Sequence, residues 1–314
     1  NNKMKIGLWH EGLVGDDLQT NESSFSTYAS EYVKFVTDNN IDRAFFILHD
    51  PNSKDGRYLK NGWFEKYWLN KLPKNCEVGL LIDTEPGSSW VNSNPILTSG
   101  DSMEIAFQYI STLNNTSGNK QITCVSFDSE DVSGSGKWGD GYYSVDGIKW
   151  INNMVGKYIT NPNFDWGFAG QSNDPNKLNN YREVYWVGEL LNCGCTGILA
   201  KNDSLKCQCP NTPYCKNKND INGILNTPIG DYLKKPELTG STIWTMFSVE
   251  STSKTDCVSL PYASNSKHPC GIMDAFGVWD KSDFMSFLNE VELKYGIKQV
   301  MIYEWQFIPK KWLI

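Results

Sequence analysis

Two pairs of carboxylates with the spacing Asp-x-Glu follow apolar runs of this sequence. Asp83 and Glu85 come directly after the run 78–82, and Asp128 and Glu130 come directly after the run 122–127. Side chains two residues apart on a strand point to the same face. Two neighbouring carboxyl groups resist ionising together, so one of them tends to keep its proton near neutral pH. Such a pair can act as a general acid with a stabilising carboxylate, the arrangement that cleaves glycosidic bonds.

Acidic residues stand at the ends of most other apolar runs too. Seven of the eight ends carry an acid, the further ones being Glu11, Asp50, Glu189, Glu250 and Glu304. The only basic groups at these ends are His10 and His49. So much negative charge at one edge of a protein points to a cationic transition state, a bound metal ion or plain exposure to solvent.

The elements that must position these residues alternate along the chain. We predict strands at 5–9, 44–48, 78–82, 122–127, 166–169, 184–187, 242–247 and 299–303. Apolar residues at the helix period predict helices at about 24–38, 63–69, 102–113, 145–159 and 282–295. Eight such units predict an α/β fold, a (β/α)8 TIM barrel that forms a single domain over residues 1–314 and has its site at the carboxyl ends of the strands.

An open doubly wound sheet is the rival fold. No Gly-x-Gly-x-x-Gly follows any predicted strand, which disfavours nucleotide binding, and we expect no cofactor. The net charge of −7 and the lack of a basic run exclude nucleic acid as a partner. No apolar run reaches the roughly 18–20 residues that span a bilayer. The sequence does not indicate an oligomeric state.

Five of the nine cysteines crowd into residues 193–215. This spacing favours disulfides over a zinc site, so we expect a Cys-rich, disulfide-stapled loop inserted after the sixth strand, and no bound metal. Disulfides imply an oxidising compartment, and we expect a secreted or extracellular protein. Candidate glycosylation sequons occur at Asn21, Asn114, Asn115 and Asn202, in a chain so rich in Asn that several would arise by chance.

The stretch from Thr123 to Glu130 resembles the fourth-strand motif Asp-Gly-x-Asp-x-Asp-x-Glu of the family-18 glycoside hydrolases, the chitinases and endo-β-N-acetylglucosaminidases. The final Asp-x-Glu is kept, while Thr123 and Ser126 replace the first two acids. The resemblance implies that Glu130 is the proton donor. It also implies that Asp128 orients the acetamido group of the substrate, which acts as the internal nucleophile of a retaining mechanism.

The resemblance continues at the last strand, where Val300-Met-Ile-Tyr303 is similar to the family's Val-Met-x-Trp. It implies a sugar platform at Tyr303 or at Trp305, two residues further on, and a contact from Tyr185 to the acetamido group. The family's third-strand Ser-x-Gly-Gly is missing. Other residues that we expect to bind substrate are Asp83, Glu85, Glu304, Trp9 and Trp244. The tryptophans have an alternative role as caps of the core.

Three functions are compatible with these residues. The first is a glycosidase acting on N-acetylhexosamine-containing glycans, with a glycan or polysaccharide as partner. The second is a carbohydrate-binding or structural surface protein on the same barrel that has lost catalysis. The third is a metal-dependent phosphodiesterase using Glu11, Asp50, Asp83 and Glu85. The sequence around His10 is similar to the His-Arg-Gly start of glycerophosphodiester phosphodiesterases but lacks the Arg.

Overall fold

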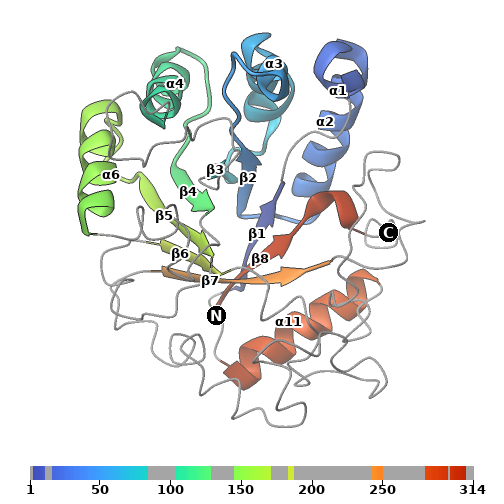
Figure 1. Ribbon diagram of the computed structural model, residues 1–314. Coiled ribbons are helices and arrows are strands. Elements are labelled where there is room, and N and C mark those ends of the chain that lie inside the picture. The colour runs from blue at the N-terminus through green and yellow to red at the C-terminus, as the bar shows by residue number, and fades with distance from the viewer. Residues whose placement is uncertain are drawn as a thin grey trace, which may run out of the picture.

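Eight parallel strands form a closed ring in the computed structural model, which describes residues 3–10, 16–83, 103–128, 145–170, 183–186, 242–249, 280–295 and 298–308. The strands are β1 (Lys5–Trp9), β2 (Arg43–Ile47), β3 (Glu77–Asp83), β4 (Cys124–Asp128), β5 (Asp165–Gly170), β6 (Glu183–Trp186), β7 (Thr242–Ser248) and β8 (Gln299–Tyr303). Each strand pairs with the next, and β8 pairs with β1. The predicted ring of eight strands is confirmed (Figure 1).

Helices lie outside this ring (Figure 1). They include α1 (Asp16–Thr20), α2 (Glu22–Asp38), α3 (Arg57–Lys60), α4 (Met103–Asn115), α6 (Val145–Tyr158) and α11 (Lys281–Tyr295). Shorter turns are η1 (Lys54–Gly56), η2 (Phe64–Trp68), η3 (Leu69–Lys71) and η9 (Trp305–Phe307). In α2 the side chain of Asn21 caps the helix by accepting from the Ser24 amide at 3.1 Å.

The strands are covered on both faces, which is why they read as nearly continuous apolar runs. Outward residues such as Leu8, Phe46 and Val125 join the core beneath the helices. Inward residues form a second, separate cluster, consisting of Trp9, Phe45, Leu81, Cys124, Trp244 and Met301.

The amino end of the ring is tightly filled. A Cβ at Gly7 would lie 2.5 Å from the Met301 Sδ atom, and a Cβ at Gly79 would lie 2.4 Å from the Phe45 ring. Below them, Arg43 is 5% exposed, bonds to the Glu77 carboxylate at 2.9 Å, and holds its guanidinium 5.1 Å from the Trp244 ring centre. The described interior is therefore closed at this end.

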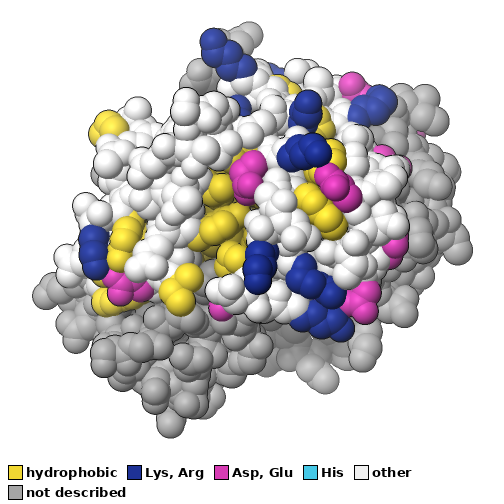
Figure 2. All heavy atoms as spheres, turned by 90° about the horizontal axis from the view of Figure 1, so that it is seen from above, with side chains coloured by type: hydrophobic (Ala, Val, Ile, Leu, Met, Phe, Trp, Pro, Cys, Tyr) yellow, Lys and Arg dark blue, Asp and Glu magenta, His cyan; other side chains and the backbone are white. Residues whose placement is uncertain are grey.

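Ion pairs join neighbouring elements on the outer surface. Arg57 of α3 lies 2.9 Å from Asp16 of α1, and Lys157 of α6 lies 2.8 Å from Glu104 of α4. On the face seen from above in Figure 1, basic and acidic side chains are interspersed over the described residues (Figure 2). Exposed pairs of this kind contribute little to stability, in the range of about 0–1 kcal/mol. Among the described residues, no helix is both long and apolar enough to cross a membrane.

The cysteines of the described chain are Cys76 and Cys124, and both are buried and neither forms a disulfide. The Cys-rich stretch 193–215, Cys257 and Cys270 lie outside the described residues. The disulfide-stapled insertion thus stays a prediction.

Candidate functional site

Asp83 and Asp128 end the neighbouring strands β3 and β4, and the strand register pairs them directly with each other. The pair below them, one alternation step further in, is Leu81 and Ser126. Two of the acids predicted to share a site are therefore adjacent in the backbone at the carboxyl edge of the ring. The other two, Glu85 and Glu130, lie outside the described residues, as does Glu11.

Ser126 lies in the inner wall of the ring beneath this edge. Its neighbour two residues back, Cys124, belongs to the interior cluster, whereas Val125 and Phe127 belong to the outer core. Ser126 is 0% exposed, and its hydroxyl has no hydrogen-bond partner. In the resemblance to the family-18 motif, position 126 stands out only because Ser replaces an acid. The alternation with Cys124 is the signal that assigns it to the interior.

Trp9 and Trp244, expected at the rim, are both 1% exposed and belong to the interior cluster. The Trp9 ring lies 5.6 Å from the Phe45 ring, and the Trp244 ring reaches within 3.2 Å of the position that a Cβ on Gly7 would take. Trp244 therefore helps to fill the amino end of the barrel. The alternative role of both tryptophans, as caps of the core, fits this placement.

Trp305 lies outside the ring of strands. It is 0% exposed, and its ring centre is 5.0 Å from that of Tyr28 and 5.3 Å from that of Tyr32, both on α2. A ring without an exposed face cannot stack on a sugar. The expectation that Trp305 shares a face with Tyr303 fails because β8 ends at Tyr303 and residue 305 begins the turn η9, where strand alternation no longer applies.

The remaining predicted residues lie along the strands. Tyr303 pairs with Trp9 on β1 and with Ser248 on β7, and Tyr185 of β6 pairs with Ala169 and with Trp244. Glu304, directly after β8, is 3% exposed.

His10 is buried behind the barrel wall and does not face the rim. Its Nε2 atom lies 2.7 Å from the Tyr28 hydroxyl, which also accepts a hydrogen bond from Gln306 at 3.2 Å. The rings of Tyr32, Phe46, Trp68 and Trp305 surround it. Burial lowers the pKa of His10 to about 3, so the imidazole is neutral at physiological pH and has a structural role.

Of the four acids in the phosphodiesterase hypothesis, Glu11 and Glu85 lie outside the described residues. Asp50 uses its Oδ1 atom to accept from the Asn52 amide at 2.9 Å, which shapes its own turn. Within the described ranges, no three His, Cys, Asp or Glu side chains are grouped so that they could hold a metal ion.

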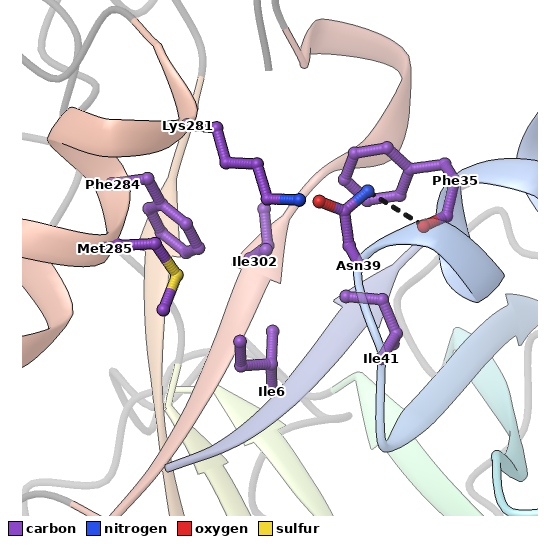
Figure 3. Close-up of a pocket in the computed structure, with 8 residues that line it drawn as sticks. All are labelled: Ile6, Phe35, Asn39, Ile41, Lys281, Phe284, Met285 and Ile302. Carbon is purple, nitrogen blue, oxygen red and sulfur yellow. Dashed lines mark hydrogen bonds between the residues drawn. The ribbon is translucent and has the colours of Figure 1, made fainter. Parts of the chain in front are cut away.

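An apolar hollow lies on the outer wall of the barrel, between the end of α2 and the start of α11 (Figure 3). Ile6 and Ile302 form its base, while Phe35 and Phe284 form its sides. At its edge, Asn39 donates to the Phe35 carbonyl at 2.9 Å. The strands separate this hollow from the paired acids, so it is not part of the candidate site.

No protein-family model matches the chain, and no curated protein matches it. Among solved structures, an endo-laminarinase from Formosa Hel1_33_131 is 11% identical with a TM-score of 0.49, over 96% of this chain and 77% of that chain. A noncanonic maltogenic alpha-amylase, AmyB from Thermotoga neapolitana, is 10% identical with a TM-score of 0.46, over 96% of this chain and 67% of that chain.

Proposed function

We propose that this protein is a glycoside hydrolase-like protein that acts on N-acetylhexosamine-containing glycans, with Glu130 as general acid and Asp128 as its partner. The observation that carries the proposal is the register of β3 and β4, which sets Asp83 beside Asp128 at the carboxyl edge of a closed parallel barrel. Barrels of this type place their sites at that edge.

The chemistry follows from the spacing of the acids. Alternation along β4 assigns position 128 to the same face as Cys124 and Ser126, the face turned to the interior. A protonated Glu130 donates its proton to the leaving oxygen as the bond to the anomeric carbon breaks. The acetamido oxygen of the substrate bonds to that carbon, and the Asp128 carboxylate stabilises the positive charge that this creates. Water then opens the intermediate, and Glu130 regains its proton.

The test is turnover of a chromogenic N,N′-diacetylchitobioside by the wild-type protein and by Glu130→Gln. We expect a loss of at least about 100-fold, since a positioned general acid contributes about 10²–10⁴-fold. Glu104→Gln, which changes an exposed acid of α4 paired with Lys157, is the matched control and keeps full activity.

Binding of N-acetylglucosamine oligomers without turnover would show that the protein is a non-catalytic glycan-binding relative. Absence of both turnover and binding would overturn the proposal. We also propose that the protein is secreted into an oxidising compartment. This second proposal rests on the Cys-rich stretch 193–215.

A further inference from the structure

Two glycosylation sequons overlap where α4 ends. Asn114 begins the sequon Asn-Asn-Thr, and Asn115 begins the sequon Asn-Thr-Ser. Both asparagines belong to the last turn of α4. Neighbouring residues on a helix point about 100° apart, so the two side chains have different surroundings. The fold therefore distinguishes two acceptors that the sequence presents as equivalent.

The Asn114 side chain holds the segment that leads into β4. Its Oδ1 atom accepts from the Ile122 amide at 2.7 Å, and its Nδ2 atom donates to the Ile122 carbonyl at 3.1 Å. Ile122 is 0% exposed and belongs to the core beneath the helices. One side chain thus binds both polar backbone groups of a residue that is anchored in the core.

A sugar on Asn114 is incompatible with this contact. A secondary amide prefers the trans form, so a substituent on Nδ2 lies on the same side of the amide as Oδ1. The two bonds to Ile122 are made on that side, since both atoms bond to the same residue. The sugar would therefore displace the donated hydrogen and leave the Ile122 carbonyl without this donor, which is unfavourable beside the core.

The Asn115 side chain faces solvent. The residue is exposed, as are the other two residues of its sequon, and its Nδ2 atom donates to the Ser111 hydroxyl one turn earlier at 3.2 Å. Water can replace such a surface bond at little cost. Directly after the sequon, a Cβ on Gly118 would meet nothing within 4 Å. A bulky, hydrophilic group therefore fits on Asn115.

This end of α4 is also remote from the paired acids. The contact between Asn114 and Ile122 sets it beside the start of β4, at the amino edge of the ring. Asp83 and Asp128 pair at the opposite, carboxyl edge. A glycan on Asn115 therefore leaves the candidate site open.

We propose that Asn115 is an N-glycosylation site and that Asn114, despite its sequon, is not. The inference rests on the proposed secretion and adds a partner, the oligosaccharide transferase of the secretory pathway. In the transfer, the Asn115 Nδ2 atom bonds to the anomeric carbon of a lipid diphosphate-linked oligosaccharide. The bond from that carbon to the diphosphate oxygen breaks, the lipid diphosphate leaves, and Nδ2 loses one proton.

The test is site occupancy in the full chain secreted from a eukaryotic host behind a cleavable leader. Thr116→Ala removes only the Asn114 sequon and Ser117→Ala removes only the Asn115 sequon, and neither changes an asparagine. Enzymatic glycan release in heavy-oxygen water marks each occupied asparagine for mass spectrometry. We expect a glycan on Asn115 in wild type and in Thr116→Ala, and none at this end of α4 in secreted Ser117→Ala.

Melting temperatures, measured after glycan removal, check the physical reason. Asn114→Gln is expected to lower the melting temperature by about 2–4 °C, because both bonds to Ile122 are lost. Asn115→Gln is the matched control on the next residue and leaves the melting temperature unchanged.

A glycan on Asn114 in the secreted protein, or a bare Asn115 in wild type, overturns this inference. Either result leaves the glycosidase proposal standing, because turnover of the chitobioside is measured separately. Absence of disulfides from the same preparation overturns the proposed compartment, and this inference fails with it.

Discussion

His10 is an ionisable side chain placed where its charged form is not tolerated. It is 1% exposed and packed among aromatic rings of α2, η2 and η9. Its Nδ1 atom has no hydrogen-bond partner. A proton taken up there would create a buried positive charge with no counter-ion described beside it, so the folded state strongly favours the neutral ring.

This burial predicts a loss of stability in acid. The pKa of His10 is about 3 in the folded protein and about 6.5 in the unfolded chain, so its contribution is fully present above pH 6.5 and is lost as the pH falls toward 3. The slope is at most about 1.4 kcal/mol per pH unit. Denaturant unfolding at pH 7 and pH 4.5 is expected to show that wild type loses about 2–3 kcal/mol relative to His10→Phe.

His49 provides the comparison. Burial lowers its pKa too, but the charge of Asp55 opposes the shift, so His49→Gln is expected to alter the pH dependence less than His10→Phe does. If the unfolding free energy of wild type and of His10→Phe changed equally with pH, the imidazole would take up its proton in the folded protein as readily as in the unfolded chain.

The places of these residues in the fold could be predicted from the sequence at some positions and not at others. Asp83 and Asp128 were predictable because they directly follow unambiguous apolar strands. His10 was expected at the rim, although it continues the outward series Ile6 and Leu8, so alternation alone could have placed it behind the wall. Trp305 was unpredictable because nothing in the sequence marks where β8 gives way to a turn.

Two glycines, Gly79 and Gly7, allow neighbouring strands to pack closely in the interior of the barrel. At Gly79 an added Cβ meets the Phe45 ring and the Cys124 sulfur, both of which are packed in the interior cluster. At Gly7 it meets the end of the flexible Met301 side chain. Gly156 in α6 has open space around its Cβ position.

Three alanine substitutions are expected to rank accordingly. Gly79→Ala costs about 1–3 kcal/mol of unfolding free energy through overpacking. Gly7→Ala costs less, because the Met301 side chain can rearrange. Gly156→Ala stabilises by about 0.5–1 kcal/mol, since alanine is the better helix former. Urea unfolding measures all three, and a Gly79→Ala protein as stable as wild type would contradict the close packing of the interior.

Most elements were predicted within about two residues, because strands covered on both faces and amphipathic helices have distinct patterns. The short helices α1 and α3 were not predicted. Residues 63–69 were predicted as an ordinary helix. They form the wider turn η2 and then the tighter turn η3. An apolar period near four residues does not distinguish these forms, and the choice depends on how Trp68 packs against Phe25 and Phe46.

The pairing state of the cysteines indicates whether the whole protein is made in an oxidising compartment. Cys76 and Cys124 are buried and neither forms a disulfide, and burial raises the pKa of the Cys76 thiol to about 12, which makes it unreactive. The other seven cysteines of the nine can form at most three disulfides. Alkylation of the denatured, unreduced protein followed by mass spectrometry is expected to label three cysteines, including these two. Labelling of all nine would overturn the prediction of an oxidising compartment.

The pairing of β1 with β8 also affects how the molecule is made. These two strands lie at opposite ends of the described chain, yet all five residues of each pair in register. A ribosome releases β1 long before β8. The backbone N–H and C=O groups of β1 that pair with β8 therefore stay unpaired until nearly all of this sequence has been synthesised. Contacts so distant in sequence form late and slowly, and nascent copies are therefore most exposed to aggregation, and most in need of chaperones, just before the last strand emerges.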